Sequence, residues 1–366
     1  MALTDLPVKK KYNIKKTPKK TLEKWYYLLA LSRSLDDRAP NYLKQAIGWS
    51  YHAPAAGHDG IQLAIGQVFD KETDHLFPYY RDLVTNVAAG LSSEEIIANG
   101  ISKDTDVAGG GRHMSNHFAK PEWNIHNVSS CTGNHTLHAT GVGRGIKKYK
   151  QKGVSISSQG ESSVSEGYVY EAINGASNEE LPVIFVFQDN GYGISVPKKD
   201  QTANRKVANN FTGLKNIRII HCNGKDVFDS MNAMEEAKDW AIKNQKPVIV
   251  QANCVRIHSH SNSDRHELYR DDNELNYVRE YDPLGKFARL LVRYNRLTEE
   301  ELAEIDAKVK AEVKAAHKKV MSDPDPDPAS IHDFVIGKEY VSEKYPEGLH
   351  DGKGPEKKLI EGINET

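Results

Sequence analysis

The sequence predicts an α/β fold in which a parallel sheet is flanked by helices. Two observations lead to this prediction. From about residue 153, strand-like and helix-like stretches alternate along the chain, which is typical of parallel sheets with right-handed crossovers. The strand-like stretch 182–187 is also continuously apolar, as expected for a strand that is buried on both faces. The length of 366 residues allows a large hydrophobic core.

The composition argues against several classes of protein. Lys and Arg number 49 and Asp and Glu number 50, so a net charge of -1 disfavours binding to nucleic acid or an anionic membrane by bulk charge. No apolar stretch approaches the ~20 residues that a membrane-spanning helix needs. The lysine-rich start is followed by a mixed helix rather than an apolar core, so we expect no secretory signal and a cytoplasmic location.

The cysteines predict no covalent or metal framework. Cys131, Cys222 and Cys254 are odd in number and include no C-x-x-C pair. We therefore expect neither a disulfide framework nor a thiolate zinc site, and we interpret these cysteines as small buried residues.

Three parts are expected along the chain. Residues 1–20 contain many lysines and predict a mobile basic arm. Residues 21–321 form the large α/β domain. Residues 322–366 begin with repeated Asp-Pro units, which cannot be helical, and predict a linker that leads towards a further domain.

The first part of the domain predicts helices followed by an irregular stretch. Apolar residues at helical spacing begin a helix at Thr21, and further helices are expected at 60–69 and 91–99. Ser92 and Glu95 form a capping box for the last of these. The polar, histidine-rich stretch 107–140 is weakly periodic, and a long irregular stretch inside a compact domain is usually functional.

The second part of the domain carries the alternating pattern. The expected strands are 153–157, 182–187, 217–222 and 247–257, and the expected helices between them are 164–176 and 227–243. Further helices are expected from Asp282 and over 299–320.

Polar residues follow two neighbouring strands of the predicted sheet. Gly160 and Glu161 follow the first strand, and Asn190 follows the second after one crossover helix. Parallel strands end side by side at the carboxyl edge of a sheet, where ligands of open α/β folds bind. Carboxylate and amide oxygens suit Mg²⁺, and small residues let the backbone approach a diphosphate. Ordinary turns at the strand ends are an equally simple interpretation of this pattern.

Two other segments contain candidate site residues. The pair Tyr80 and Arg81 suits a phosphate contact, although an ordinary Arg–Asp surface pair with Asp82 is the simpler interpretation. The loop after the fourth strand contains His258, His260 and His266, and loops at this edge often carry catalytic histidines. A zinc site made by these histidines is a weaker alternative.

Taken together, these motifs resemble the α subunits of 2-oxoacid dehydrogenase E1 components, which depend on thiamine diphosphate. The resemblance rests on GESSVSEG at 160–167 and DNGYGIS at 189–195. It also includes YR at 80–81, GRHM at 111–114, VSS at 128–130 and RIHSHS at 256–261, in family order. The branched-chain (2-oxoisovalerate) type is the most similar. The resemblance implies the thiamine-diphosphate-binding fold.

The resemblance also implies roles for individual residues. Glu161, Asn190 and the Tyr192 carbonyl would hold Mg²⁺, and His260 would be the catalytic residue that closes over the reacting carbon. The other residues expected to bind the cofactor are Tyr80, Arg81, Ser130, Gly160, Ser162 and Ser163.

Some residues depart from the family pattern. Ser162 replaces a glycine of the motif, and Gln188 stands where a diphosphate-binding arginine is often found, which would weaken cofactor binding. Ser129 and Asn134 match a monovalent cation site, but His135 stands where the family often has glutamine, which argues against potassium here. Thr132 occupies a position that is usually apolar.

The implied function is oxidative decarboxylation of a 2-oxoacid, most simply a branched-chain one, with acyl transfer to a lipoyl group. Pyruvate or acetoin as the substrate, and a catalytically degenerate assembly subunit, are the alternatives. The carboxylate that activates the cofactor pyrimidine comes from the β subunit in this family, and we find no candidate for it in this chain.

The implied partners follow from that missing carboxylate. They are an E1 β subunit or a fused β domain, and a lipoyl-bearing E2 acyltransferase in a multienzyme complex. Residues 358–366 are similar to the opening helix of a β subunit, which favours a fused chain over an ordinary tail. We therefore expect either an α2β2-type assembly or a homodimer of fused chains. Ser259, Ser261 and Ser263 lie where some members of the family are phosphorylated, although a mobile hydrogen-bonding loop is the simpler interpretation.

Overall fold

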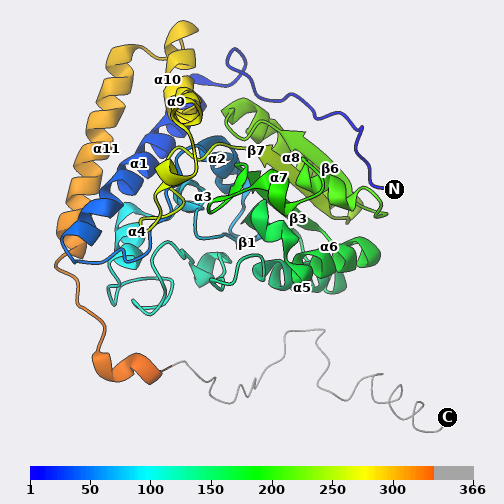
Figure 1. The fold of residues 1–366 in the computed structure, drawn as a ribbon, viewed down its shortest axis with the longest axis horizontal. Helices are drawn as coiled ribbons and strands as arrows, with labels where there is room; N and C mark the ends of the chain where they lie inside the picture. Colours follow the sequence, from blue (N-terminus) through cyan, green and yellow to red (C-terminus); the bar gives the residue numbers. More distant parts are fainter. Residues whose placement is uncertain (334–366) are drawn as a thin grey trace. The chain divides into compact units, whose positions relative to one another are not determined.

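A computed structural model describes residues 1–333 of the chain (Figure 1). Residues 1–326 form one compact unit, which contains every strand of the described chain. Residues 327–333 begin a second unit and contain one short 3₁₀ helix, Pro328–His332. The segment at 358–366 that suggested a fused β domain lies outside the described residues. Within residues 1–333, no helix is long and apolar enough to cross a membrane.

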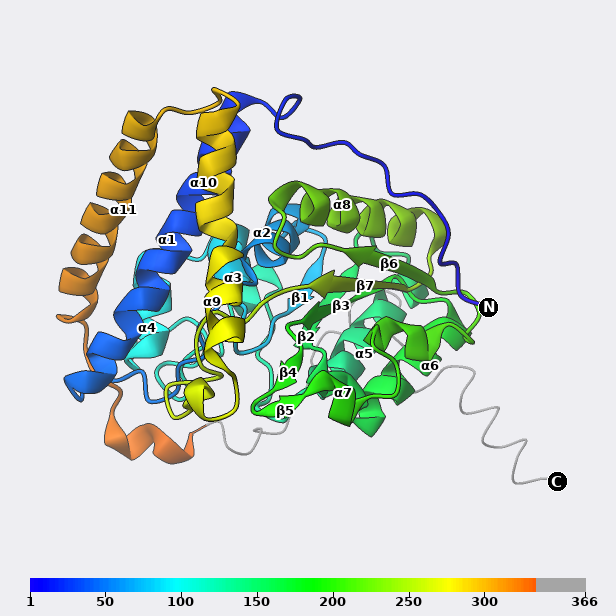
Figure 2. The ribbon, with the colours of Figure 1, turned by 45° about the horizontal axis from the view of Figure 1, so that its top comes forward.

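The main sheet is parallel throughout, as the alternation of strands and helices predicts. Its strand order is β1-β2-β3-β7-β6 (Figure 2). The strands are β1 (His75–Phe77), β2 (Ser155–Gly160), β3 (Val183–Asp189), β6 (Arg218–Cys222) and β7 (Val248–Asn253). Gly160 at the end of β2 pairs with Gln188 near the end of β3, so the two strands end at the same edge.

Helices cover both faces of this sheet. Alternate residues of β3 belong to two separate apolar clusters, with Ile184 and Val186 on one face and Phe185 and Phe187 on the other. Helices α2 and α8 cover the first face, and α5 and α6 cover the second (Figures 1 and 2). These helices are α2 (Asp59–Val68), α5 (His135–Lys148), α6 (Gly167–Glu179) and α8 (Val227–Asn244).

A second group of helices packs beside the sheet and shares the larger apolar cluster. Long helix α1 lies against both α10 and α11 (Figure 2). The capping box at Ser92 is present, and Thr298 forms another at the start of α11. The remaining helices are α1 (Lys19–Lys44), α3 (Leu83–Ala89), α4 (Ser93–Gly100), α9 (Asp272–Glu280), α10 (Pro283–Arg293) and α11 (Glu299–Val320).

Strand β1 and helices α3 and α5 are among the elements that the sequence pattern did not predict. Strand β1 has only three residues, and α3 is short. Helix α5 begins at His135, inside the stretch 107–140 that we expected to be irregular. Its histidines and glycines hide the apolar period, because only five of its residues are buried: His135, Thr136, Ala139, Gly143 and Ile146.

The lysine-rich arm is not detached in the structure, which differs from the expectation of a mobile segment. Leu3 forms a parallel bridge with Arg218 at the free edge of β6. Tyr12 donates from its hydroxyl to Glu235 on α8 over 2.7 Å, and its ring meets the Trp25 ring edge-on at 5.5 Å. The lysines face solvent, and the few apolar residues between them hold the arm to the domain.

Replacing Tyr12 with Ala is expected to lower the free energy of unfolding by about 2 kcal/mol, since it removes an aromatic pair and buried apolar area. Tyr12→Phe, which removes only the hydroxyl, is expected to lose less. Urea unfolding followed by tryptophan fluorescence measures both changes. The exposed Lys10 offers a matched control, and a Tyr12→Ala protein as stable as Lys10→Ala would show that the arm does not stabilise the domain.

Candidate active site at the carboxyl edge of the sheet

A cavity of about 650 Å³ opens at the ends of β2 and β3. Every residue that we expected to bind a cofactor or metal lines it: Tyr80, Arg81, Ser130, Gly160, Glu161, Ser162, Ser163, Asn190, Tyr192 and His260. These residues come from five separate segments of the chain. Sequence spacing predicted only that the first two strands would end together, so the gathering of the other segments is a result of the tertiary fold.

Glu161 and Asn190 form the polar floor of the cavity. Glu161 is 3% exposed, and its carboxylate oxygen Oε2 accepts from the Asn190 backbone N–H over 3.2 Å. The other oxygen, Oε1, has no partner among residues 1–333. Burial, and then the nearby Asp189, raise the pKa of Glu161 to about 8. An unpaired buried carboxylate oxygen is costly, so this position suits a cation.

The loop that carries Asn190 and Tyr192 is tied down behind the cavity. Asp189 at the end of β3 accepts from Lys198 at 2.6 and 2.8 Å and from Gln251 at 2.7 Å. Asn190 Oδ1 accepts from the Tyr192 N–H over 3.2 Å, which fixes the position of this oxygen. The loop continues into a small hairpin of β4 (Tyr192–Gly193) and β5 (Val196–Pro197), followed by α7 (Lys198–Gln201).

Arg81 supplies a buried positive charge on the opposite wall of the cavity. Its guanidinium donates to the carbonyl oxygens of Pro54 at 2.8 Å and His260 at 3.0 Å. No carboxylate of residues 1–333 forms an ion pair with it, although Arg81 is only 2% exposed. A buried cation whose hydrogen-bond partners are all neutral suits an anion such as a diphosphate.

His260 lies next to Arg81 in a defined protonation state. Arg81 Nη2 donates to His260 Nδ1 over 3.2 Å, so the proton of the neutral ring is on Nε2. Burial, Arg81 and Arg256 lower the pKa of His260 to about 3. The backbone N–H of His260 donates to Asp264 over 2.7 Å, which anchors the loop that presents the ring. A neutral imidazole with a free N–H can donate to a group in the cavity.

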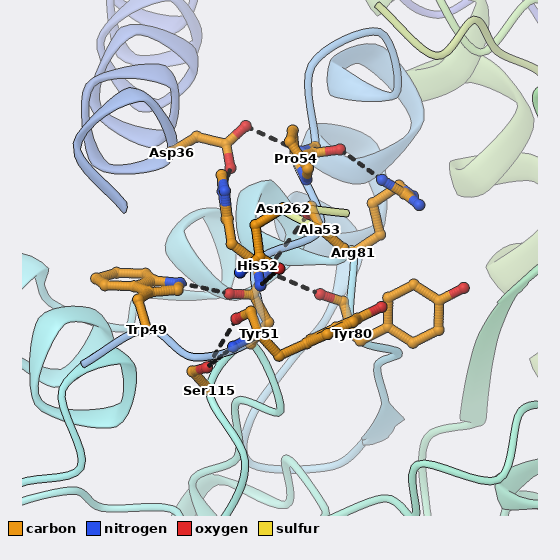
Figure 3. A network of polar contacts seen from close by, with 12 residues as sticks. Asp36, Trp49, Tyr51, His52, Ala53, Pro54, Tyr80, Arg81, Ser115 and Asn262 are labelled. Atoms are coloured by element: carbon orange, nitrogen blue, oxygen red, sulfur yellow. Dashed lines mark hydrogen bonds and ion pairs between the residues drawn. The ribbon is translucent and has the colours of Figure 1, made fainter. Parts of the chain in front are cut away.

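Residues 49–57, which we call the strap, hold this wall in place (Figure 3). The strap is fastened to α1 through Asp36, whose carboxylate accepts from the Ala55 N–H at 2.9 Å and meets His52 Nε2 at 2.7 Å. Gly57 closes the strap against the segment after β7. A Cβ there would lie 1.9 Å from the Val255 carbonyl oxygen, and the φ of +102° also favours glycine.

The strap connects Arg81 with the histidine loop. Pro54 supplies the carbonyl that receives Arg81, and His52 exchanges two hydrogen bonds with Asn262 at 2.9 and 3.1 Å (Figure 3). Because Asn262 is two residues from His260, one segment positions both the guanidinium and the imidazole. The sequence analysis did not identify the strap as part of the site.

Ser130 and His117 form a hydrogen-bonded pair on the cavity wall, which the sequence pattern did not predict. His117 Nδ1 lies 3.2 Å from the Ser115 carbonyl, which can only accept, so His117 Nε2 is the acceptor for the Ser130 hydroxyl at 3.0 Å. Burial lowers the pKa of His117 and keeps the ring neutral. The Ser130 oxygen is thereby left as an acceptor towards the cavity.

The residues that depart from the family pattern have distinct positions. Ser162 lines the cavity, and a side chain on Gly193 would collide with its hydroxyl, since a Cβ would lie 2.4 Å from Ser162 Oγ. Gln188 does not line the cavity and is fully buried. His135 donates to the Ser158 carbonyl over 2.8 Å. Thr132 lines the cavity, and its backbone carbonyl accepts from Tyr168.

The alternative zinc site is not present in the part of the chain that the structure describes. Among residues 1–333, no three His, Cys, Asp or Glu side chains gather as metal ligands. His258 is exposed, whereas His266 is buried against Arg270. The cysteines are free; Cys222 and Cys254 are buried as expected, but Cys131 is exposed.

Comparison with known proteins finds a matching family model and several relatives. Residues 26–329 match the family model of the dehydrogenase E1 component. The 2-oxoisovalerate dehydrogenase subunit alpha of Bacillus subtilis is 27% identical over 313 residues, which cover 86% of this chain and 94% of that protein. The pyruvate dehydrogenase E1 component subunit alpha of Staphylococcus aureus is 30% identical over 289 residues, covering 78% and 74%. The mitochondrial pyruvate dehydrogenase E1 component subunit alpha of Dictyostelium discoideum is 28% identical over 274 residues, covering 74% and 70%.

Replacing Arg81 with Ala is expected to weaken the binding of inorganic diphosphate by about 10- to 100-fold, since hydrogen bonds to charged groups contribute about 1.5–3 kcal/mol. Arg81→Lys keeps the charge but lacks the planar fork, so it should restore only part of the affinity. Isothermal titration calorimetry measures these changes. Arg279→Ala, at an exposed position on α9, is the control. Equal affinities in Arg81→Ala and the control would contradict an anion site at Arg81.

Proposed function

This chain belongs to the dehydrogenase E1 component family and is an E1 α chain of a 2-oxoacid dehydrogenase, an oxidoreductase; we propose that its substrate is a branched-chain 2-oxoacid. The observation that carries the proposed reaction, apart from the choice of substrate, is the gathering of the expected cofactor-binding residues around one cavity. The reaction would decarboxylate the 2-oxoacid oxidatively and pass the acyl group to a lipoyl group.

Two observations support a branched-chain substrate. The Bacillus subtilis 2-oxoisovalerate relative is covered over nearly its whole length, whereas the pyruvate relatives are covered over about three quarters. Met114, Ile194 and Val196 also line the cavity and are exposed apolar side chains. Apolar surface at the mouth of the cavity suits a branched aliphatic acyl chain.

Membership of this family implies thiamine diphosphate, and the residues of the cavity fit it together with Mg²⁺. The unpaired oxygen of Glu161 and the Asn190 side-chain oxygen are hard-cation donors, and Arg81 offers an unneutralised cation for the diphosphate. When bound, thiamine diphosphate supplies the electron sink that decarboxylation of a 2-oxoacid requires.

Residues of this chain would bind the cofactor and the metal, orient the substrate and donate a proton. Arg81 and the Tyr80 hydroxyl would hold the diphosphate, while Glu161, Asn190 and the Tyr192 carbonyl would hold Mg²⁺. The backbone at Gly160, Ser162 and Ser163 can approach the phosphates closely because these residues are small.

The cavity wall would orient the rest of the cofactor and the substrate. The Ser130 oxygen, turned towards the cavity by His117, would accept a hydrogen bond from the pyrimidine end of the cofactor. His260 carries its proton on Nε2 and is therefore able to donate to the substrate carboxylate or carbonyl oxygen. The strap holds His260 and Arg81 at a set separation, since it is bonded to both segments.

The site would be completed by partners. We propose an E1 β chain, which would supply the carboxylate that activates the pyrimidine ring, and a lipoyl-bearing E2 acyltransferase. This proposal is supported by the lining of the described cavity, where the acidic residues other than Glu161 are Glu166 and Asp200, and both are exposed. An exposed carboxylate is poorly suited to hold a proton on a buried ring nitrogen.

Two alternatives remain as outcomes of the experiments below. A pyruvate substrate is favoured by the slightly higher identity to the Staphylococcus aureus relative. A degenerate subunit was suggested by Gln188 and Ser162, but Gln188 lies outside the cavity and Ser162 leaves it open.

Replacing Glu161 with Ala is expected to weaken Mg²⁺-dependent binding of thiamine diphosphate by more than about 100-fold, because a metal contributes several kcal/mol of charge stabilisation. The measurement is calorimetric titration of the assembly with its β partner, with and without EDTA. Glu166→Ala, a neighbouring carboxylate at the cavity mouth, is the matched control. Cofactor binding that is indifferent to both EDTA and Glu161→Ala would contradict the metal site, and no binding by the wild type would support the degenerate subunit.

With its β partner and a lipoyl acceptor, the protein is expected to have a higher kcat/KM for 3-methyl-2-oxobutanoate than for pyruvate. Each methyl group that fits an apolar pocket is worth about 1–3 kcal/mol, or roughly 10- to 200-fold. Steady-state kinetics with both substrates decides the question. A preference for pyruvate would favour the alternative substrate.

A further inference from the structure

A buried polar network lies behind the cavity and centres on Gln188. Its amide nitrogen donates to Asp82 at 2.6 Å and to Ser158 at 2.8 Å. Its amide oxygen accepts from Gln62 at 2.9 Å and lies 2.8 Å from His58 Nδ1. All of these side chains are fully buried, so every hydrogen bond of the Gln188 amide is made within the protein.

The network determines which nitrogen of His58 carries the proton. The Gln188 oxygen can only accept, so His58 Nδ1 donates to it and carries the hydrogen. His58 is fully buried, and in the neutral ring the other nitrogen, Nε2, has a lone pair and no hydrogen.

That lone pair faces Asn190, one of the residues expected to bind the metal. Asn190 Nδ2 lies 3.2 Å from His58 Nε2, and Asn190 Oδ1 accepts from the Tyr192 N–H at 3.2 Å. In the reversed orientation, the Asn190 oxygen would face the His58 lone pair and its NH₂ group would face the Tyr192 N–H. Both contacts would be repulsive, so the amide has one favourable orientation.

The same network reaches the anion-binding wall. Gln62 donates both to Gln188 and to the Arg81 carbonyl at 3.1 Å. Asp82 accepts from Gln188 and from the Tyr79 N–H at 3.1 Å. The segment that carries Arg81 and the loop that carries Asn190 are therefore joined through Gln188 and His58.

We propose that His58 is a positioning residue for the metal site, which orients the Asn190 amide so that its oxygen faces the cation and is itself oriented by Gln188. This inference rests on the proposed function, because it assumes that Asn190 is a metal ligand. It also assigns Gln188 a role. Gln188 orients His58 and does not contact the diphosphate itself.

Two substitutions separate the hydrogen bonds of His58 from its volume. His58→Leu fills similar space but can neither donate to Gln188 nor accept from Asn190. His58→Gln can do both, since its amide nitrogen can donate to Gln188 while its oxygen accepts from Asn190. His126→Leu is the control, because His126 is a partly buried histidine that stacks on Phe77 and lies outside the network.

The measurement is the dissociation constant of Mn²⁺, used as the metal probe, from the assembly with its β partner and thiamine diphosphate. Electron paramagnetic resonance of free Mn²⁺ reports binding without turnover. His58→Leu is expected to weaken Mn²⁺ binding by about 10- to 100-fold, the usual effect of removing a group that orients a metal ligand. His58→Gln should recover most of the affinity, and His126→Leu should keep it.

The outcomes distinguish this inference from the proposed function. If the wild type binds no Mn²⁺ in the presence of thiamine diphosphate, the metal site itself is wrong. If the wild type binds Mn²⁺ and His58→Leu binds it equally well, only the role of His58 is overturned. Should His58→Leu fail to fold, a folded His58→Gln protein with strongly reduced affinity overturns the proposed orientation, and one with near-wild-type affinity supports it.

Discussion

The parallel pairing of β2 with β3 is the constraint on which the rest of the site depends. Gly160 is in register with Gln188, so the residues that follow each strand emerge together at one edge of the sheet. Glu161 and Asn190 thereby come within 3.2 Å of each other, although a helix and a strand separate them in the chain. A shift of the register by one residue would turn every side chain to the opposite face and separate these two groups.

Burial of ionisable groups is the main energetic feature of the cavity. Glu161 and Arg81 are both nearly fully buried, and burial raises the pKa of Glu161, which disfavours its charged form. Such an arrangement opposes stability in the empty protein, and it suits a ligand that carries both a cation and an anion. The strap on one side and the Gln188 network on the other hold these groups in place. Without them, the side chains could relax and reduce the energetic cost of burial.

The sequence predicted β3 well because this strand is buried on both faces and is continuously apolar. Residues 182–187 illustrate this, since alternate side chains of β3 enter the two apolar clusters. The prediction failed where local signals are weak. Strand β1 has three residues, α5 begins with polar residues, and the arm combines lysines with a few anchoring apolar side chains such as Tyr12.

The sequence by itself determined the fold class, because strand periodicity is a local property of the chain. Its short motifs also carried the resemblance to the family, which implied the residues of the candidate cofactor site. Only the tertiary structure decided how these residues are oriented. The protonated nitrogens of His58, His117 and His260 follow from partners that are 130, 2 and 179 positions away in the chain. The direction of a hydrogen bond depends on which groups are in contact. The contacts of His58 and His260 arise from packing between segments that are distant in the chain.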